Sequence, residues 1–131
     1  METIKIATKK GSEFIDITAK VKTIVHEKRI KKGFCCVFCP HTTAALTINE
    51  NADPAVTGDI INHLDKLVPK NGKFSHSEGN SDAHIKSSLL ESSLNIFIED
   101  YKLALGTWQG IYFCEFDGPR NRKIYLDVIE R

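Results

Sequence analysis

Three histidines, His41, His76 and His84, lie in polar stretches of small residues where no packing role explains them. A neutral imidazole is the commonest protein ligand for metal ions, and three of them leave one position of a zinc ion open for chemistry. Their spacings match no local metal motif. The residues alone therefore leave two interpretations open: one shared metal site, or three separate histidines that form hydrogen bonds in loops.

The other two histidines and the helix around His84 refine this picture. His26 and His63 fall on the polar faces of predicted helices, so we expect them to be solvated. His84 lies in the first turn of a predicted helix, where the helix dipole disfavours a charged ring. A metal ion binds the neutral ring, and this placement therefore favours ligation.

Several carboxylates could support chemistry near the histidines. Glu115 shares a face with Ile111 and Phe113 in a predicted strand, so its side chain is expected to point inward. A buried carboxylate needs a partner, which a ligating histidine, a metal-bound water, or an Arg or Lys ion pair would supply. Glu50 and Glu78 lie in polar stretches, where general-base work, support of a ligand and simple solvation are the alternatives.

Two further features could contact a substrate. Trp108, the only tryptophan, lies between Gly106 and Gly110 and could stack on an aromatic ring, although a core position is the alternative. The basic cluster Arg120–Lys123 is either an anion site or solvated loop charge.

The cysteines are not predicted to bind metal. Cys35 and Cys39 share one face of the predicted strand Phe34–Cys39 but lie about 13 Å apart along it, and Cys36 points the opposite way. Such a set cannot surround one tetrahedral ion, so these residues and Cys114 are predicted to be small core residues.

The length, the net charge and the apolar runs of the chain exclude several classes of protein. The 131 residues fit a single domain, 1–131, and the 18 basic and 17 acidic residues give a net charge of +1. A sequence-independent nucleic-acid binder needs an excess of Lys and Arg that this chain lacks. The chain has neither the apolar core of a signal peptide nor the roughly 20 apolar residues of a membrane span. We therefore expect a soluble, cytoplasmic protein with reduced cysteines and no nucleic-acid or membrane partner.

Local signals predict the helices. Thr18 is the expected N-cap of a first helix, and Asp53-Pro54 combines a capping carboxylate with a proline at the first helical position of a second. Ser81 or Asp82 can cap a short helix that runs through Leu90. In that helix, Asp82 and Lys86 are spaced for an ion pair.

Alternating and continuous apolar runs predict the strands. Glu2–Thr8 and Phe14–Ile17 flank the turn Gly11-Ser12 and are predicted to form a hairpin. Further strands are predicted at 34–39, 46–48, 93–98, 111–116 and 123–129, with a turn at 117–119. Strands, then helices, then strands indicate an α+β fold rather than a doubly wound sheet.

Three segments of the chain resemble the YjbQ family, whose members are often named secondary thiamine-phosphate synthase. They are HTTAALTINENADP (41–54), HSEGN followed by AHIKSS (76–88) and GTWQGIYFCEFDGPR (106–120). The resemblance covers essentially the whole chain. It implies an α+β fold of two packed, mostly antiparallel β-sheets in a sandwich-like arrangement, with two to three helices outside, assembled as a homotrimer.

The resemblance also implies a metal site, carried over onto His41, His76 and His84. The ion would be a divalent transition metal such as zinc, with Mg²⁺ as the alternative for a pyrophosphate substrate. Other positions characteristic of the family are Asn49, Glu50, Ser87, Ser88, Trp108, Gln109, Glu115 and Arg120. The chain departs from many members at Phe116-Asp117, where they carry His-Arg, and at Ala45, often serine; both changes bear on substrate contacts.

Three functions follow as hypotheses. The resemblance implies a transferase that joins a hydroxymethylpyrimidine pyrophosphate to a thiazole phosphate and releases pyrophosphate, with Arg120 on a phosphate and Trp108 on the pyrimidine. The second hypothesis is a zinc hydrolase that uses a metal-bound water, with Glu50 or Glu115 as the proton acceptor. The third is a trimeric module that binds a metal or ligand without catalysis.

Overall fold

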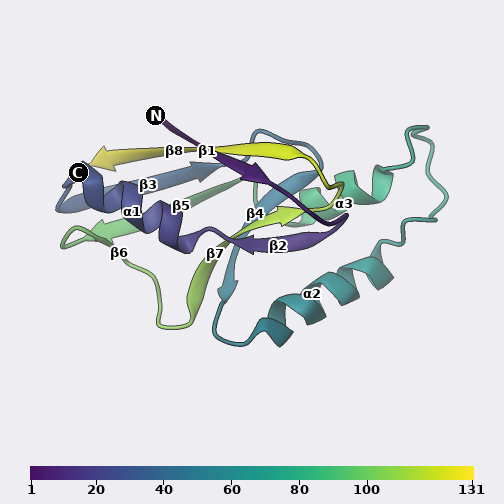
Figure 1. Ribbon diagram of the computed structural model, residues 1–131, viewed down its shortest axis with the longest axis horizontal. Helices are drawn as coiled ribbons and strands as arrows, with labels where there is room; N and C mark the ends of the chain where they lie inside the picture. The colour runs from purple at the N-terminus through teal and green to yellow at the C-terminus, as the bar shows by residue number, and fades with distance from the viewer.

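The computed structural model describes residues 1–131 and contains three helices and two antiparallel β-sheets (Figure 1). The helices are α1 (Thr18–Lys28), α2 (Pro54–Leu67) and α3 (Ser81–Leu89). The strands are β1 (Glu2–Ala7), β2 (Glu13–Asp16), β3 (Lys32–Phe38), β4 (Ala44–Glu50), β5 (Ser93–Glu99), β6 (Lys102–Leu103), β7 (Gln109–Glu115) and β8 (Asn121–Glu130). The predicted α+β class and the predicted strands are confirmed, and the short strand β6 is an addition.

Sheet pairing differs from the prediction at the amino terminus. The larger sheet has the order β1-β8-β3-β5-β6, and the smaller one β2-β7-β4. β1 pairs with β8 and β2 pairs with β7, so the hairpin predicted for the first two strands is wrong. Alternation of apolar residues sets which face of a strand is buried but does not name its partner. The turn at 8–12 instead carries the chain from one sheet to the other.

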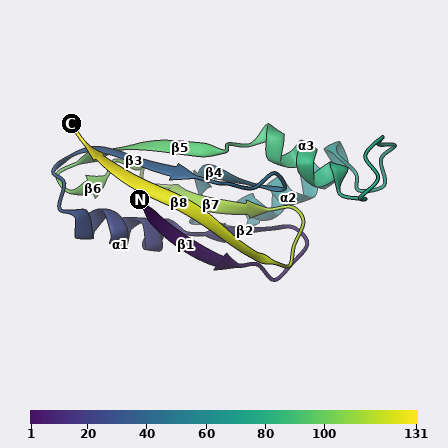
Figure 2. The same ribbon diagram turned by 90° about the horizontal axis from the view of Figure 1, so that it is seen from above.

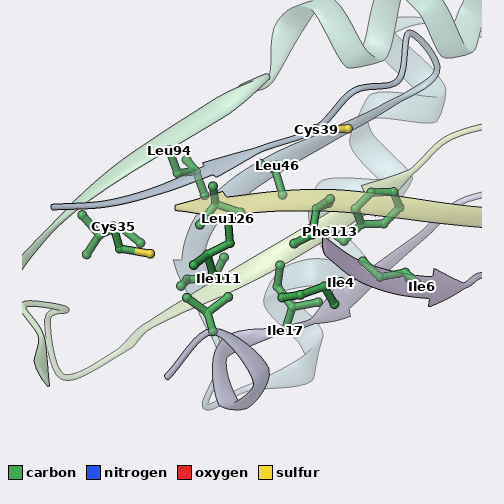
Figure 3. Packing of buried hydrophobic residues seen from close by; sticks show 14 of the residues in the cluster. Ile4, Ile6, Ile17, Cys35, Cys39, Leu46, Leu94, Ile111, Phe113 and Leu126 are labelled. Atoms are coloured by element: carbon green, nitrogen blue, oxygen red, sulfur yellow. The ribbon is translucent and has the colours of Figure 1, made fainter. Parts of the chain in front are cut away.

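The main core lies between the two sheets and beside α1. It consists of 17 buried residues, among them Ile4 of β1, Val37 of β3, Leu46 of β4 and Phe113 of β7. Figure 3 shows side chains from both sheets pointing toward one another in this layer. Burial of this apolar surface is the main term that holds the sheets together.

Three of the four cysteines are core residues as predicted: Cys35 and Cys39 lie in the main core and Cys114 in a second apolar cluster, whereas the prediction is wrong for Cys36. Cys35, Cys39 and Cys114 are buried, Cys36 is half-buried on the opposite face of β3, and all four are free thiols. Burial raises the pKa of Cys35 to about 12 and also raises the pKa of Cys39 and Cys114. These thiols are therefore protonated near neutral pH and serve as apolar packing groups.

A second apolar cluster joins α2 and α3 to the smaller sheet. It contains Ala45, Ala83, Tyr112, Cys114 and Phe116, and Leu64 of α2 packs against it. β7 is therefore covered on both faces, and its residues from 110 to 115 are all buried. In Figures 1 and 2, α2 and α3 lie at one end of the molecule, and both chain termini lie near the other end.

The helix starts test the capping predictions. The Asp53 carboxylate accepts a hydrogen bond from the Ala55 N–H at 2.9 Å, with Pro54 as the first helical residue, which confirms that prediction. Thr18 is not the N-cap of α1: it is the first helical residue, and its N–H and hydroxyl both donate to the Asp16 carboxylate. α3 begins after Asn80 without a side-chain cap. None of the helices combines the length and apolar character that crossing a membrane requires.

Candidate functional site

Two of the three candidate ligands lie against each other. His84 is in α3, and His76 lies in the loop before it; their ring centroids are 5.4 Å apart, with planes at 84°. The Nδ1 of His76 is 3.1 Å from the Ser81 hydroxyl, and its Nε2 is 4.0 Å from the Glu78 carboxylate. The short chain path from the loop into α3 thus produces a histidine pair at the start of a helix.

His41 lies near this pair but is held by another element. Its Nε2 is 3.1 Å from the backbone nitrogen of Lys123 and 3.0 Å from the carbonyl oxygen of the same residue, and its ring meets Phe113 edge-on. Burial and then the positive charge of Arg122 lower the pKa of His41. Both effects favour the neutral ring, which is the form that binds metal.

A cleft of about 500 Å³ connects His41 with His84, and we call it the histidine cleft. Its wall consists of His41, Thr42, Ala44, His84, Ser87, Ser88, Leu90 and Ser92. The hydroxyl of Ser87 donates to the Thr42 carbonyl at 2.6 Å, and that of Ser88 donates to the His84 carbonyl at 2.8 Å. The Ser87 hydroxyl thus joins α3 to the segment that carries His41, whereas the Ser88 hydroxyl bonds within α3.

The three rings do not form one coordination set in this structure. No group of three or more His, Cys, Asp or Glu side chains has the arrangement that holds a metal ion. The structure therefore brings His76 to His84, places His84 and His41 on one cleft, and leaves His41 hydrogen-bonded to β8. His26 and His63 are exposed on α1 and α2, as predicted.

Glu115 has the ion pair that the sequence left open as one alternative. Its buried carboxylate accepts two hydrogen bonds from Arg122, at 2.8 and 2.5 Å, and one from the Thr8 hydroxyl at 2.8 Å. The backbone N–H groups of Phe116 and Asp117 donate to it as well. Burial alone would raise the pKa of Glu115, but the hydrogen bonds from Arg122 and Thr8 outweigh it and lower that pKa.

Arg122 is the buried residue that the sequence reasoning missed. It lies in β8 two and four positions before Ile124 and Leu126, which are buried on the core face. The alternation of β8 therefore gave the signal that Arg122 faces inward. Its guanidinium also donates to the Thr43 hydroxyl at 2.8 Å, so it joins β7 to the segment beside His41.

Arg120, a candidate phosphate ligand, already binds a carboxylate. Its Nε donates to the Asp117 carbonyl at 2.9 Å, and its terminal nitrogen donates to the Asp117 carboxylate at 2.7 Å. The side-chain amide of Asn80 donates to the same carboxylate oxygen. Arg120 is thus held on the turn between β7 and β8 rather than on the histidine cleft.

The remaining candidates lie at the far end of the smaller sheet. In the β4–β7 pair, Ala44 lies opposite Glu115 at one end, and Glu50 lies opposite Gln109 at the other. The six residue steps between Ala44 and Glu50 span about 20 Å. Asn49, Glu50, Trp108 and Gln109 are therefore remote from the histidines within one chain.

At that far end, each side chain has a local role. The Gln109 side chain accepts the Gly106 N–H at 2.8 Å, and the Asn49 side chain accepts the Glu50 N–H at 2.7 Å. The Glu50 carboxylate accepts the Asp53 N–H at 3.3 Å. Trp108 is 64% exposed, so the alternative that it is a core residue is wrong.

Comparison with known proteins gives close relatives over the full length. A family model described as "UPF0047 protein YjbQ-like" matches residues 2–131. UPF0047 protein MJ1081 of Methanocaldococcus jannaschii is 55% identical, over 95% of this chain and 91% of its own length. UPF0047 protein YugU of Bacillus subtilis is 47% identical over 98% of both chains.

Solved structures agree with the fold described above. A YjbQ/UPF0047-family protein from Clostridium acetobutylicum superposes with a TM-score of 0.97 at 56% identity, covering 98% of this chain and all of the other. A YbjQ-like protein from Sulfolobus solfataricus gives a TM-score of 0.95 at 31% identity, covering 99% of this chain and 96% of the other. The chain therefore belongs to the UPF0047, YjbQ-like family.

Proposed function

We propose that this protein is a metal-dependent enzyme whose ion is held by His76 and His84, with His41 as the third ligand. The observation that carries the proposal is the contact between the rings of His76 and His84, 5.4 Å apart, beside the cleft that His84 shares with His41. Three imidazoles and an open position suit zinc or a similar divalent ion, whereas Mg²⁺ prefers oxygen ligands.

His76 and His41 each have one ring nitrogen that is available for the proposed ion. The Nδ1 of His76 is near the Ser81 hydroxyl, so its Nε2 is the nitrogen free for an ion, and only the exposed Glu78 carboxylate is near it. In the tautomer whose Nε2–H donates to the Lys123 carbonyl at 3.0 Å, the Nδ1 of His41 carries the lone pair that an ion would bind. A backbone partner on the other nitrogen is the usual way in which a ligating histidine is oriented.

For the reaction, we propose the transferase activity that the resemblance implies, in which a hydroxymethylpyrimidine pyrophosphate is joined to a thiazole phosphate. A divalent ion bound there would supply Lewis-acid stabilisation of the leaving pyrophosphate. The hydroxyls of Ser87 and Ser88 lie on the same cleft and can donate to phosphate oxygens if they exchange their present carbonyl partners. Glu115 has the role of a positioning residue, because Arg122, Thr8 and backbone N–H groups already occupy its carboxylate.

A hydrolase is the second candidate, and one specific observation favours it. The Asp117 carboxylate occupies the guanidinium of Arg120, so no free guanidinium is ready for a pyrophosphate. A phosphoester or amide substrate would not require that contact. Glu50, the other proposed proton acceptor, is too far from the histidines to act within its own chain.

We further propose that the protein assembles as a homotrimer in which the end carrying Trp108 and Glu50 faces the histidines of a neighbouring copy. The separation of about 20 Å along β4 within one chain supports this proposal, because these residues can serve one site only across a subunit boundary. The outer face of the larger sheet also carries exposed Phe97 and Ile129, whose contact with a second copy would remove apolar surface from water.

The test combines metal content with turnover. Elemental analysis of the purified protein should find about one transition metal per chain, and His84→Ala should remove it, whereas His63→Ala on exposed α2 should retain it. Pyrophosphate release from the pyrimidine and thiazole substrates should be lost in His84→Ala and kept in His63→Ala. Turnover of a phosphoester or amide panel without pyrophosphate release would replace the transferase by the hydrolase, and metal retained by His84→Ala would overturn the ligand assignment.

A further inference from the structure

Strands β1 and β8 carry two lysines directly opposite each other. Lys5 and Lys123 are partners in the antiparallel pairing of these strands, which lie side by side in Figure 2. Partners in an antiparallel pair point to the same face of the sheet. Both lysines are exposed, whereas their neighbours Ile4 and Ile124 belong to the core. Two like charges therefore share a small area on the outer face of the larger sheet.

The position of this pair in the ladder brings the two side chains especially close. The backbone N–H and carbonyl of Lys123 both face the Nε2 of His41, at 3.1 and 3.0 Å, and hence point away from β1. Three positions along, the Thr8 N–H donates to the Arg120 carbonyl at 3.0 Å. Because hydrogen-bonded and non-hydrogen-bonded pairs alternate, Lys5 and Lys123 form a non-hydrogen-bonded pair, with Cα atoms about 4.5 Å apart. Like charges at such a position destabilise the strand pair.

Neither lysine of this pair has an acidic partner. Lys86 shows the contrast: its Nζ is 3.7 Å from the Asp82 carboxylate, which confirms the ion pair predicted within α3. Lys5 and Lys123 form no ion pair. The outward-facing carboxylate on β8, Asp127, lies four residues beyond Lys123, about 13 Å along the strand. The fold thus keeps two opposed cations without any compensating charge.

The two lysines line a cavity of about 570 Å³, which we call the β1–β8 cavity. Its wall includes Lys5, Ala7, His41, Asn121, Arg122 and Lys123, and no acidic residue. Glu115 already holds the guanidinium of Arg122. The Nζ of Lys123 lies 5.5 Å from the centre of the Tyr125 ring, which is neutral. The uncompensated positive charge of the cavity therefore resides on the two lysines.

We propose that Lys5 and Lys123 bind a doubly charged anion, a phosphate group, in the β1–β8 cavity. A phosphate monoester carries nearly two negative charges at neutral pH and has several acceptor oxygens, so one group compensates both ammonium groups. A carboxylate would compensate only one of them. The side-chain amide of Asn121, on the same face, offers further N–H donors. Within the basic cluster 120–123, Lys123 rather than Arg120 is then the anion ligand.

The β1–β8 cavity adjoins the proposed metal site without depending on it. His41 lines both this cavity and the histidine cleft. The phosphate group can therefore belong to a free ion or to one end of a substrate whose other end reaches the cleft. The two lysines need no metal to attract it, so the site goes beyond the proposed function and is tested separately from it.

The test titrates the full-length protein with sodium phosphate at constant ionic strength and follows amide NMR shifts. Phosphate should shift the signals of Ala7, Asn121 and Lys123 until they saturate, and chloride should not. Lys5→Gln should weaken phosphate binding about fivefold, the value of one surface ion pair. The control Lys20→Gln removes the same charge from an exposed position on α1 and should leave binding unchanged. Equal shifts with chloride, or undiminished binding by Lys5→Gln, would overturn the proposal.

Thermal unfolding gives an independent measurement on the same variant. Without phosphate, Lys5→Gln should have a higher Tm than the native protein, because it removes one of the two opposed charges. With phosphate, the Tm of the native protein should rise more than that of Lys5→Gln. If Lys5→Gln melts no higher than the native protein without phosphate, the lysines do not repel each other and the argument for an anion fails.

Two further titrations separate this site from the metal and identify the source of the phosphate group. His84→Ala should bind phosphate as the native protein does, and loss of the shifts at Ala7 would place the anion on the metal and contradict the lysine site. Phenyl phosphate is the ester probe. If it binds as tightly as inorganic phosphate, the ligand is a phosphate ester, and if inorganic phosphate alone binds, the ligand is the free ion; both results support the anion site.

Discussion

Glu115 and Arg122 form an ion pair in which both side chains are withdrawn from water, with 0% and 3% exposed. Arg122 also donates to Thr43, and Glu115 also accepts from Thr8, so the pair joins β7 and β8 to two neighbouring segments. One of these segments carries His41. The pair thus holds in place the segment that carries His41, the candidate metal ligand.

Removal of one partner of this ion pair should destabilise the fold strongly. Arg122→Met leaves the Glu115 carboxylate buried without its cation, and we expect the free energy of unfolding to fall by about 3–5 kcal/mol. The control Arg120→Met alters an exposed ion pair and should cost no more than about 1 kcal/mol. Urea unfolding monitored by circular dichroism measures both values, and equal losses would show that Arg122 has no special structural role.

The same pair predicts a pH dependence. The pKa of Glu115 is lowered in the folded protein because hydrogen bonds from Arg122 and Thr8 outweigh the effect of burial. A carboxyl with a lowered folded pKa stabilises the fold above its unfolded pKa, about 4.3, and this contribution disappears as the pH falls through the folded pKa. The native protein should therefore lose stability between pH 5 and pH 3 more steeply than Glu115→Gln. Parallel curves of unfolding free energy against pH would contradict the assignment.

The sequence predicts those features of the fold that depend on neighbouring residues, and it does not predict those that depend on distant segments. Asp53-Pro54 predicts a helix start correctly because capping is a contact within three residues. The partner of β1 could not be predicted, because its alternation of Ile4 and Ile6 suits any neighbouring strand. The predicted cap at Thr18 is wrong because the sequence does not show that the Asp16 carboxylate accepts the Thr18 N–H.

In the candidate site, too, contacts between residues close in the sequence can be predicted, and contacts between distant segments cannot. The inward position of Glu115 follows from the alternation of its strand, and the buried Arg122 follows from the alternation of β8 once a charged residue is allowed to face the core. The contact between His76 and His84 could be anticipated, since eight positions separate them. The place of His41 could not, because it depends on how β8 passes beside the end of β3.

β3 and β8 approach each other at Gly33 so closely that a larger residue should not fit there. A Cβ atom at Gly33 would lie 2.2 Å from the Ile129 carbonyl oxygen, a backbone atom that cannot rotate away. Gly33→Ala should therefore lower the free energy of unfolding by about 2 kcal/mol or more. Gly58→Ala in α2 meets no atom within 4 Å and should raise it by up to about 1 kcal/mol. Thermal unfolding of the two variants should shift in opposite directions, and a tolerated Gly33→Ala would mean that the strands separate easily.

The exposed position of Trp108 allows a test of whether neighbouring copies share a site. Trp108→Ala removes a side chain that is 64% exposed, so stability should change by no more than about 0.5 kcal/mol.

If Trp108 serves the histidines of another copy, Trp108→Ala and His84→Ala should each abolish turnover alone. Co-expressed chains carrying one change each should then recover a fraction of the native activity, because some subunit boundaries pair an intact Trp108 with an intact His84. A chain that carries both changes offers neither side chain to any boundary, and it should stay inactive when expressed alone. If mixed single variants remain as inactive as either parent, the two ends of β4 do not meet across a boundary, and Trp108 has no part in the histidine site.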